Sequence, residues 1–151
     1  MLSPAPNTAL NLYETDYNLW IAHTIQALKT SDLDAIDLAN LIDELEDMGR
    51  SEKRAIYSNL KILLMHLLKY RYQSSKRSKS WRSTIREHRQ RIQRAFKESP
   101  SLQGYFQEIL TEAYQDAREL AADETELSFC TFPENCPFST EEILNSDYLP
   151  D

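Results

Sequence analysis

The chain has only two glycines and two cysteines among its 151 residues, and it contains no long apolar run. Glycine is the residue that most readily adopts the positive φ angles of tight turns, so its scarcity favours long helices. No stretch approaches the roughly 18 apolar residues that a membrane-spanning helix needs, and the first residues lack the basic and apolar regions of a signal peptide. We therefore expect a cytoplasmic protein without membrane contact.

The motifs of several enzyme classes are also missing. The sequence has no glycine-rich phosphate loop, no G-x-S-x-G, no H-E-x-x-H and no E-x-x-H pair, which removes support for nucleotide hydrolases, serine hydrolases, zincins and di-iron bundles. Cys130 and Cys136 have no further cysteine or histidine nearby to complete a zinc site, so we expect two reduced thiols. Asp43 and Asp47 share a helical face, but a cation site needs further oxygen ligands at defined positions. We predict no metal and no cofactor.

Hydrophobic periodicity predicts an all-α fold, a compact bundle of four to five helices with a short C-terminal extension. At 41% hydrophobic and 27% charged residues, 151 residues fit a single domain, with a core over about 13–122 and an extension over 127–151. Apolar stripes at helical spacing, with capping residues at their ends, predict the elements. The expected helices cover residues 13–29, 37–49, 51–72, 80–97 and 99–122, with a short one after Ser139. Asp37 is the expected N-cap of the second helix, and the run from Leu60 onward is apolar nearly all round, which predicts a centrally packed third helix.

Three predicted boundaries rest on single residues. Gly49 has the residue type that commonly ends a helix in the left-handed conformation, so we place a break between the second and third helices there. Ser80 is expected to cap the fourth helix, and Ser99 followed by Pro100 to open the fifth. The sequence from Ser139 to Glu142 is a capping-box pattern.

Basic and acidic residues are segregated along the chain. Eleven of the 17 basic residues lie between Lys69 and Lys97 beside a single acid, Glu87, so this stretch has a formal net charge of +10. The rest of the chain carries −17. Dense Lys and Arg bind phosphates regardless of base sequence, and the interleaved Tyr70, Tyr72 and Trp81 could stack on unpaired bases. Trp81 also opens the apolar stripe of the fourth helix, so we expect it to lie mostly in the core. The same charge pattern also suits pairing with another subunit or protein.

Three long stretches, IDELEDMGRSEKRA, KILLMHLLKY and RSKSWRSTIREHRQRI, resemble the bacterial family called domain of unknown function 29. The resemblance extends from YETDYNLW near the start to TFPENCPF and DYLP at the end. It implies a compact helical bundle and no established reaction. Within these stretches, the polar or aromatic positions characteristic of the family are Asp16, Glu44, Arg50, His66, Trp81, Arg82 and Arg86. At His88 the family pattern leads us to expect glutamine instead.

Some of these side chains could form one site. His66 interrupts an apolar run, so we expect its imidazole to be buried and to need a hydrogen-bond partner. A Glu44–His66 or an Arg86–Glu44 pair could simply satisfy such buried polar groups. Alternatively, Glu44, His66 and Arg86 could together carry out acid-base chemistry. Arg82 and His88 match the R-x(4–6)-H spacing of helical HEPN ribonucleases, but positions six apart do not share a helical face.

The leading functional prediction is a small binding or regulatory module that contacts nucleic acid, either RNA or single strands, through a basic helix. Its expected contact residues are Lys76, Arg77, Lys79, Arg82, Arg86 and Arg89. The alternative is a protein-interaction module or homo-oligomer that uses its acidic and basic poles, and a metal-independent nuclease comes third.

Overall fold

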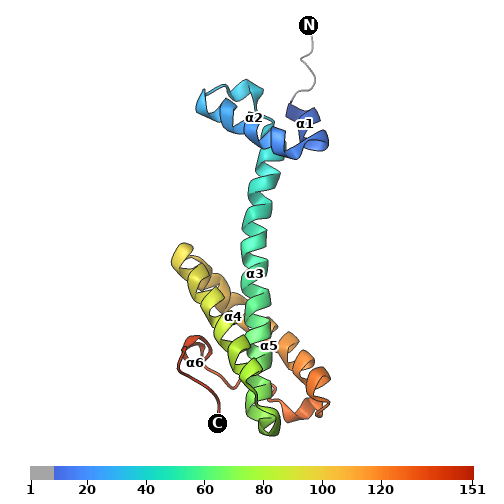
Figure 1. Cartoon of the computed structure of the whole chain (residues 1–151), viewed down its shortest axis with the longest axis vertical. Coiled ribbons are helices and arrows are strands. Elements are labelled where there is room, and N and C mark those ends of the chain that lie inside the picture. The colour runs from blue at the N-terminus through green and yellow to red at the C-terminus, as the bar shows by residue number, and fades with distance from the viewer. Residues whose placement is uncertain (1–8) are drawn as a thin grey trace. The chain divides into compact units, whose positions relative to one another are not determined.

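The computed structural model describes residues 9–151, and every regular element within them is helical (Figure 1). The predicted all-α class is therefore confirmed. The α-helices are α1 (Ala9–Thr15), α2 (Tyr17–Lys29), α3 (Leu38–Tyr72), α4 (Lys79–Glu98), α5 (Leu102–Thr125) and α6 (Thr140–Leu144). Short 3-10 turns occur at η2 (Leu33–Ala35), η3 (Ser74–Lys76) and η4 (Phe129–Thr131). None of the helices in this described part of the chain is both long and apolar enough to span a bilayer.

The chain divides into two compact units, an N-terminal unit of residues 1–51 and a C-terminal unit of residues 52–151. Helix α3 contributes residues to both units. The expectation of a single domain stays a prediction.

Helix α3 runs without interruption through Gly49, so the predicted helix break at this residue is wrong. Gly49 does not adopt a positive φ angle, and the i,i+3 pair of Arg50 with Asp47 bridges the same turn. Helix-favouring neighbours on both sides extend the helix across the glycine, because one glycine costs only about 1 kcal/mol relative to alanine. A glycine in a sequence marks a helix end only when the residues beyond it cannot continue the helix.

Replacement of Gly49 by alanine is expected to raise the free energy of unfolding by about 0.5 to 1 kcal/mol, because alanine has less conformational freedom to lose in a helix. A Cβ atom built at Gly49 meets no atom within 4 Å, so no steric cost offsets the gain. Thermal unfolding followed by circular dichroism would measure the change. Gly49→Pro should do the opposite and cost roughly 3 kcal/mol. If Gly49→Ala destabilises the protein, the continuous helix is wrong.

The other boundaries are set by side-chain caps, some of which the sequence predicted. Asp37 accepts a hydrogen bond from the amide of Asn40 at the start of α3, and Ser139 forms the complete capping box of α6, as expected. Ser78, rather than Ser80, caps α4 by accepting from the Trp81 amide. The predicted first helix is broken in two, because the side chain of Asp16 caps α2.

The start of α5 also differs from the prediction. Ser99 follows the last residue of α4, where its amide donates to Ala95, and α5 begins only at Leu102. Pro100 therefore lies in the connection and not in the first turn of the fifth helix.

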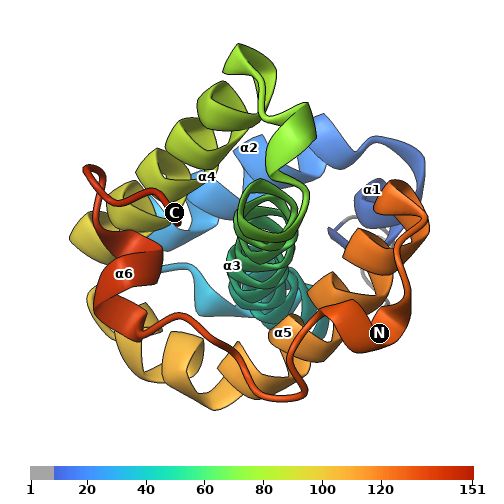
Figure 2. The same ribbon diagram turned by 90° about the horizontal axis from the view of Figure 1, so that it is seen from below.

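The core of the C-terminal unit forms around the second half of α3. Figure 2, seen along this helix, shows α4 and α5 beside it and α6 against α4. The apolar run of α3 is buried nearly all round, as its sequence predicted, and includes Leu60, Leu63, Leu64, Leu67 and Leu68. Buried residues facing it on α4 and α5 include Ile85, Ile92, Phe106, Ala113 and Ala117. Phe132, Phe138 and Ile143 bring the chain beyond α5 into the same core.

The N-terminal unit has a much smaller interior. Among its described side chains, the buried apolar ones are Trp20, Ala27 and Ile36. Trp20 lies in an aromatic group with Tyr13 and Tyr17, at ring-centroid distances of 4.8 and 5.8 Å. This difference in burial between the two units decides which surfaces are available for binding.

Candidate functional site

The predicted contact residue Arg89 is almost completely buried, with 2% of its surface exposed. Its guanidinium group donates hydrogen bonds to three backbone carbonyls, those of Ile143 at 2.8 Å, Tyr148 at 2.7 Å and Glu142 at 3.0 Å. Two of these carbonyls belong to α6, at the end of a helix where carbonyls lack intrahelical partners and cations are favoured. Arg89 therefore fastens the C-terminal residues to α4 and has no free donor surface for a phosphate.

Arg77 is also committed to structure. Its Nε donates to the carbonyl of Tyr70 at 2.7 Å, and its guanidinium carbon lies 4.4 Å from the centre of the Tyr70 ring. A longer hydrogen bond, at 3.4 Å, reaches the carbonyl of Pro150. Like Arg89, Arg77 links the connection before α4 to the end of the chain.

The remaining predicted contact residues are exposed cations. Lys76, Lys79, Arg82 and Arg86 have no acidic or carbonyl partner among residues 9–151. Lys79, Arg82 and Arg86 fall on one side of α4, opposite the buried Ile85 and Ile92. Arg94 and Lys97 extend the same side toward the end of the helix, so the row of cations spans roughly 27 Å at 1.5 Å per residue. We call this row the basic stripe of α4.

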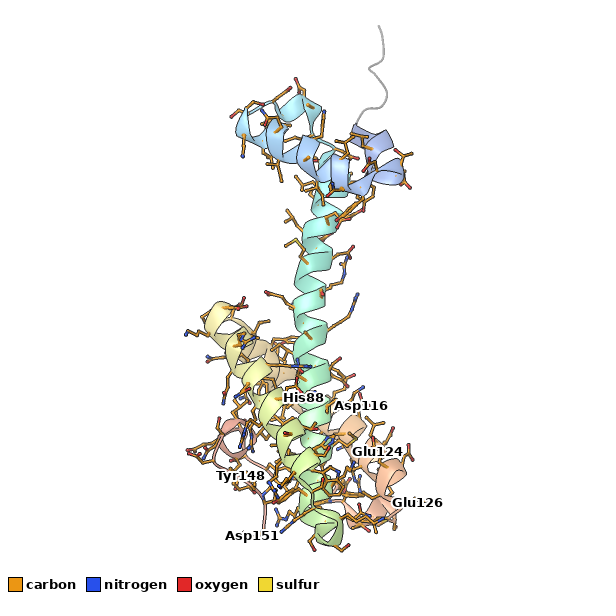
Figure 3. The ribbon with its side chains drawn as sticks, in the orientation of Figure 1. His88, Asp116, Glu124, Glu126, Tyr148 and Asp151 are labelled. Atoms are coloured by element: carbon orange, nitrogen blue, oxygen red, sulfur yellow. The ribbon has the colours of Figure 1, made fainter. Side chains whose placement is uncertain are left out.

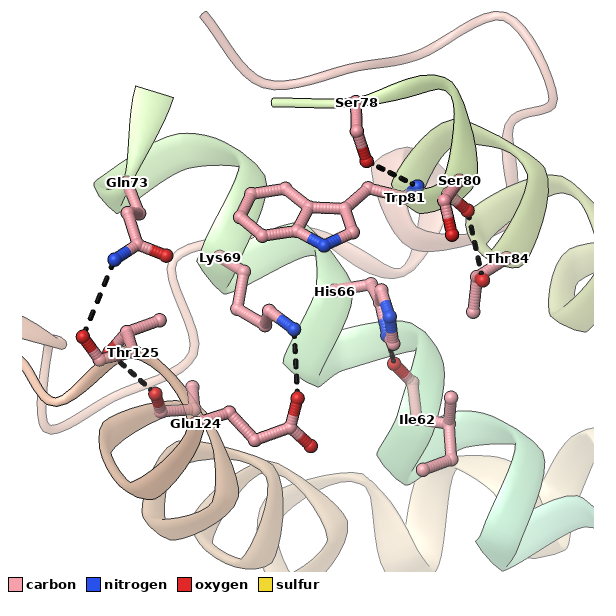
Figure 4. A network of polar contacts seen from close by, with 11 residues as sticks. Ile62, His66, Lys69, Gln73, Ser78, Ser80, Trp81, Thr84, Glu124 and Thr125 are labelled. Atoms are coloured by element: carbon pink, nitrogen blue, oxygen red, sulfur yellow. Dashed lines mark hydrogen bonds and ion pairs between the residues drawn. The ribbon is translucent and has the colours of Figure 1, made fainter. Parts of the chain in front are cut away.

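The aromatic residues of the basic segment do not lie open for base stacking. Tyr70 is buried, and Tyr72 and Trp81 are partly buried against the core. The Trp81 indole covers the side chain of Lys69, whose ammonium lies 4.8 Å from the ring centre and pairs with Glu124 at 2.8 Å (Figure 4). The expectation that Trp81 serves mainly in packing fits this arrangement.

His66 lies in the same polar group, beside Trp81 and Lys69 (Figure 4). Its Nδ1 lies 3.0 Å from the carbonyl of Ile62, one turn earlier on α3, so the imidazole donates its proton within its own helix. Burial lowers the pKa of His66, and the positive charge of Lys69 lowers it further, while Glu124 acts in the opposite direction. The ring is thus held in its neutral form at neutral pH.

We expect the C-terminal unit to lose stability as the pH falls below 6.5. The pKa of His66 in the folded state lies below its ordinary value of 6.5, so below that pH the unfolded chain binds the proton more readily than the folded one. The free energy of unfolding should therefore decrease with falling pH, by at most about 1.4 kcal/mol per pH unit. Urea unfolding between pH 5 and 7.5 would measure this slope.

His66→Gln should flatten that slope, while the exposed His23→Gln serves as the matched control and should leave it unchanged. His88, which contributes to the low pKa of His66, keeps its own Nδ1 2.9 Å from the Thr84 carbonyl. An equal slope in wild type and His66→Gln would contradict the assignment to His66.

Glu44 holds the N-terminal unit together. Its two carboxylate oxygens accept hydrogen bonds from the hydroxyl groups of Tyr13 at 2.7 Å and Tyr17 at 2.8 Å. These bonds are the main cause of the raised pKa of both phenols, to about 12 for Tyr13. They join α1 and α2 to α3, so both carboxylate oxygens of Glu44 accept from tyrosine hydroxyl groups within the N-terminal unit.

The three candidate catalytic residues consequently have separate surroundings. Glu44 binds tyrosines in the N-terminal unit, His66 binds a carbonyl in the C-terminal unit, and Arg86 is exposed on α4. Arg82 is exposed while His88 is half-buried, as their six-residue spacing implies (Figure 3 labels His88). A catalytic role for these residues stays a prediction. Of the other family positions, Asp16 caps α2 and Arg50 pairs with Asp47.

Cys136 lines a small pocket between α5 and the C-terminal segment, together with Tyr114 and Phe138. Burial raises the pKa of the Cys136 thiol, which leaves it protonated and weakly nucleophilic at neutral pH. Cys136 and Cys130 are both unpaired, as the sequence predicted. Among residues 9–151, no group of His, Cys, Asp or Glu side chains has an arrangement that could hold a metal ion.

The most unusual surface was not predicted as a site. Of the large hydrophobic side chains that are exposed in the described chain, ten lie between Tyr17 and Met48, and two lie in the C-terminal unit. On α2, one exposed row consists of Tyr17, Ile21, Ile25 and Leu28; on α3, another consists of Leu38, Ile42, Leu45 and Met48. We call these rows the α2 stripe and the α3 stripe. Both rows are visible in the sequence from their helical spacing, but they fall within the predicted core of about 13–122.

The fold defines an all-α protein in the part of the chain that the structure describes. The chain belongs to the family described as "Domain of unknown function DUF29", whose model matches residues 12–149. The comparisons with curated proteins and with solved structures found no match. The family assignment confirms the predicted resemblance.

Proposed function

We propose that this protein is an interaction module that binds a protein partner through the α2 and α3 stripes. The observation that supports the proposal most directly is the exposure of the α3 stripe, where Leu45 and Met48 are 57% and 65% exposed. Soluble proteins expose single hydrophobic residues routinely, whereas contiguous apolar patches mark interaction sites.

The spacing of these side chains suits recognition of a helix. Leu38, Ile42 and Leu45 follow each other at intervals of four and three residues, which aligns them on one side of α3. Apolar residues at these intervals are the anchors by which helices pack against each other. On α2, only one edge of the apolar side is covered, by burial of Trp20, Thr24 and Ala27.

Capture from a lysate with matched variants tests this proposal. Leu45→Gln should weaken partner capture at least about tenfold, because a buried leucine contributes roughly 1.5 to 3 kcal/mol. The matched control is Leu19→Gln, since Leu19 is equally exposed, at 50%, but lies on the opposite side of α2 from the stripe. Both changes are on the surface and should leave the melting temperature nearly unchanged.

Nuclease treatment of the lysate separates the two classes of partner. Capture that survives nuclease, is lost in Leu45→Gln and persists in Leu19→Gln supports the proposal. Capture that is indifferent to Leu45→Gln contradicts it.

Nucleic-acid binding is the second candidate, and the basic stripe of α4 supports it. Its five cations follow one exposed helical side, and the one ion pair on this helix, Arg91 with Glu87, lies beside that side. Such a row could release counterions from several phosphates at once. The burial of Arg89 and the partial burial of Trp81 leave this candidate with fewer contacts than the sequence indicated.

Salt dependence of oligonucleotide binding tests the second candidate. Log affinity for a single-stranded oligonucleotide should fall with log salt at about −0.7 per phosphate contact, so Arg82→Ala with Arg86→Ala should flatten the slope by roughly 1.4. The control is Arg91→Ala, which removes a cation already paired with Glu87. Absence of binding at low salt, or equal slopes in the double variant and the control, would exclude the basic stripe as a phosphate-binding surface.

A further inference from the structure

The two units differ in net charge as well as in apolar exposure. Residues 1–51 contain nine acidic and two basic residues, a formal net charge of −7, whereas residues 52–151 contain fifteen of each. The whole net charge of the protein thus resides in the unit that exposes the α2 and α3 stripes.

Carboxylates border the α3 stripe directly. Glu46 lies one turn beyond Ile42 on the same helix, and Asp43 follows next around the helix. Both are exposed and form no salt bridge in the described part of the chain, because Arg50 pairs with Asp47 and acts on Asp43 and Glu46 only through longer-range attraction. An apolar row with unpaired carboxylates at its edge favours a ligand that has apolar residues on one side and cations beside them.

We propose that the α3 stripe docks a basic amphipathic helix of a different protein. The inference rests on the interaction function proposed above and adds the chemistry of the partner. Leucine-like side chains of that helix pack on Leu38, Ile42 and Leu45, while its lysines or arginines face Asp43 and Glu46. In this mode of recognition, an amphipathic helix lays its apolar face on anchor residues at intervals of three and four residues.

A second copy of this chain is a poor occupant on two grounds. Its N-terminal unit carries the same charge of −7, so pairing of two such units brings like charges together. Its own basic helix, α4, has the required charge but not a free apolar side, because Ile85 and Ile92 are 1% and 0% exposed in the core. The occupant must therefore come from another protein.

Three synthetic 18-residue peptides and the full-length protein test the proposal. The first peptide has leucine at helical spacing and lysine elsewhere, the second has glutamate in place of lysine, and the third has the composition of the first in an order without amphipathic spacing. Fluorescence anisotropy at low and physiological salt gives the affinities. The lysine helix should bind at least about tenfold more tightly than either other peptide, and the difference from the glutamate helix should shrink with salt.

Variants separate the apolar contribution to binding from the electrostatic one. Leu45→Gln should weaken binding of the lysine helix about tenfold at both salt concentrations, and Glu46→Gln should weaken it a few-fold at low salt only. Glu108→Gln, which removes an exposed carboxylate from α5, is the matched control and should have no effect.

The outcomes distinguish this inference from the function on which it rests. Equal binding of the lysine and glutamate helices, both lost in Leu45→Gln, would overturn the basic partner and leave the interaction function intact. No binding of any helical peptide would overturn the inference, and the function would then depend on the lysate experiment. Concentration-dependent dimers that Leu45→Gln abolishes would assign the surface to a second copy and overturn the inference.

Discussion

Replacement of Arg89 by methionine is expected to lower the free energy of unfolding of the C-terminal unit by about 3 to 5 kcal/mol. Methionine retains much of the apolar stem but cannot donate to the three carbonyls that the guanidinium group binds. A buried acceptor without a partner costs roughly 1 to 3 kcal/mol, and three acceptors are affected at once. The change should therefore be the largest among single substitutions in the basic segment.

Urea unfolding with Arg86→Met as the control measures this effect. Arg86 lies three residues earlier on α4 and is exposed, so its loss should change stability by less than about 0.5 kcal/mol. Similar unfolding midpoints for the two variants would show that Arg89 does not hold the C-terminal residues. Burial lowers the pKa of Arg89, but the ordinary pKa of a guanidinium group lies so far above neutral that the group remains charged at pH 7.

Replacement of Trp20 by alanine is expected to cost about 3 to 5 kcal/mol, the range for truncating a large buried aromatic side chain. Trp20 is 2% exposed and is one of three buried apolar residues in the described part of the N-terminal unit. Because so little other core supports this unit, we expect it to unfold locally while the C-terminal unit stays folded. Hydrogen exchange of the amides in α2 should then accelerate strongly, with little change in α5.

Trp20→Phe is the informative control. The indole Nε1 of Trp20 is buried and has no hydrogen-bond partner in the described structure, so phenylalanine removes an unsatisfied donor together with part of the ring. Removal of the unsatisfied donor stabilises the protein, whereas loss of part of the ring destabilises it. The net decrease in the free energy of unfolding should therefore be well below that of Trp20→Ala. Equal exchange rates in α2 for Trp20→Ala and wild type would show that the N-terminal unit does not depend on Trp20 to stay folded.

The sequence predicted the local features of the fold that depend on neighbouring residues. Asp37 and Ser139 cap their helices as expected, and the apolar run of α3 is central. Prediction from neighbouring residues fails where two local signals compete. At Gly49, the helix propensity of the residues on both sides outweighs the tendency of glycine to end a helix. Likewise Ser78 and Ser80 are both suitable caps, and the position of the first turn of α4 selects Ser78.

The candidate site was less predictable because it depends on burial. Arg86 and Arg89 are similar in sequence, and only the packing of the C-terminal residues on α4 separates them. One signal was present, since Arg89 lies four residues after Ile85 and three before Ile92 and so falls on the apolar side. The α3 stripe shows the opposite error. Periodicity located it correctly, but periodicity cannot tell whether the complementary surface belongs to the same chain.

The hydrogen bonds of Arg89 impose an order on folding during synthesis. Its partner Ile143 lies 54 residues later in the chain, so a ribosome adding about 5 to 20 residues per second makes this acceptor roughly 3 to 11 seconds after the arginine. Throughout that interval, α4 has a guanidinium group that cannot be buried without an unpaired charge. The side of α4 that carries Arg89 must therefore remain exposed to solvent until α6 has been synthesised. The C-terminal unit consequently completes its packing late during synthesis.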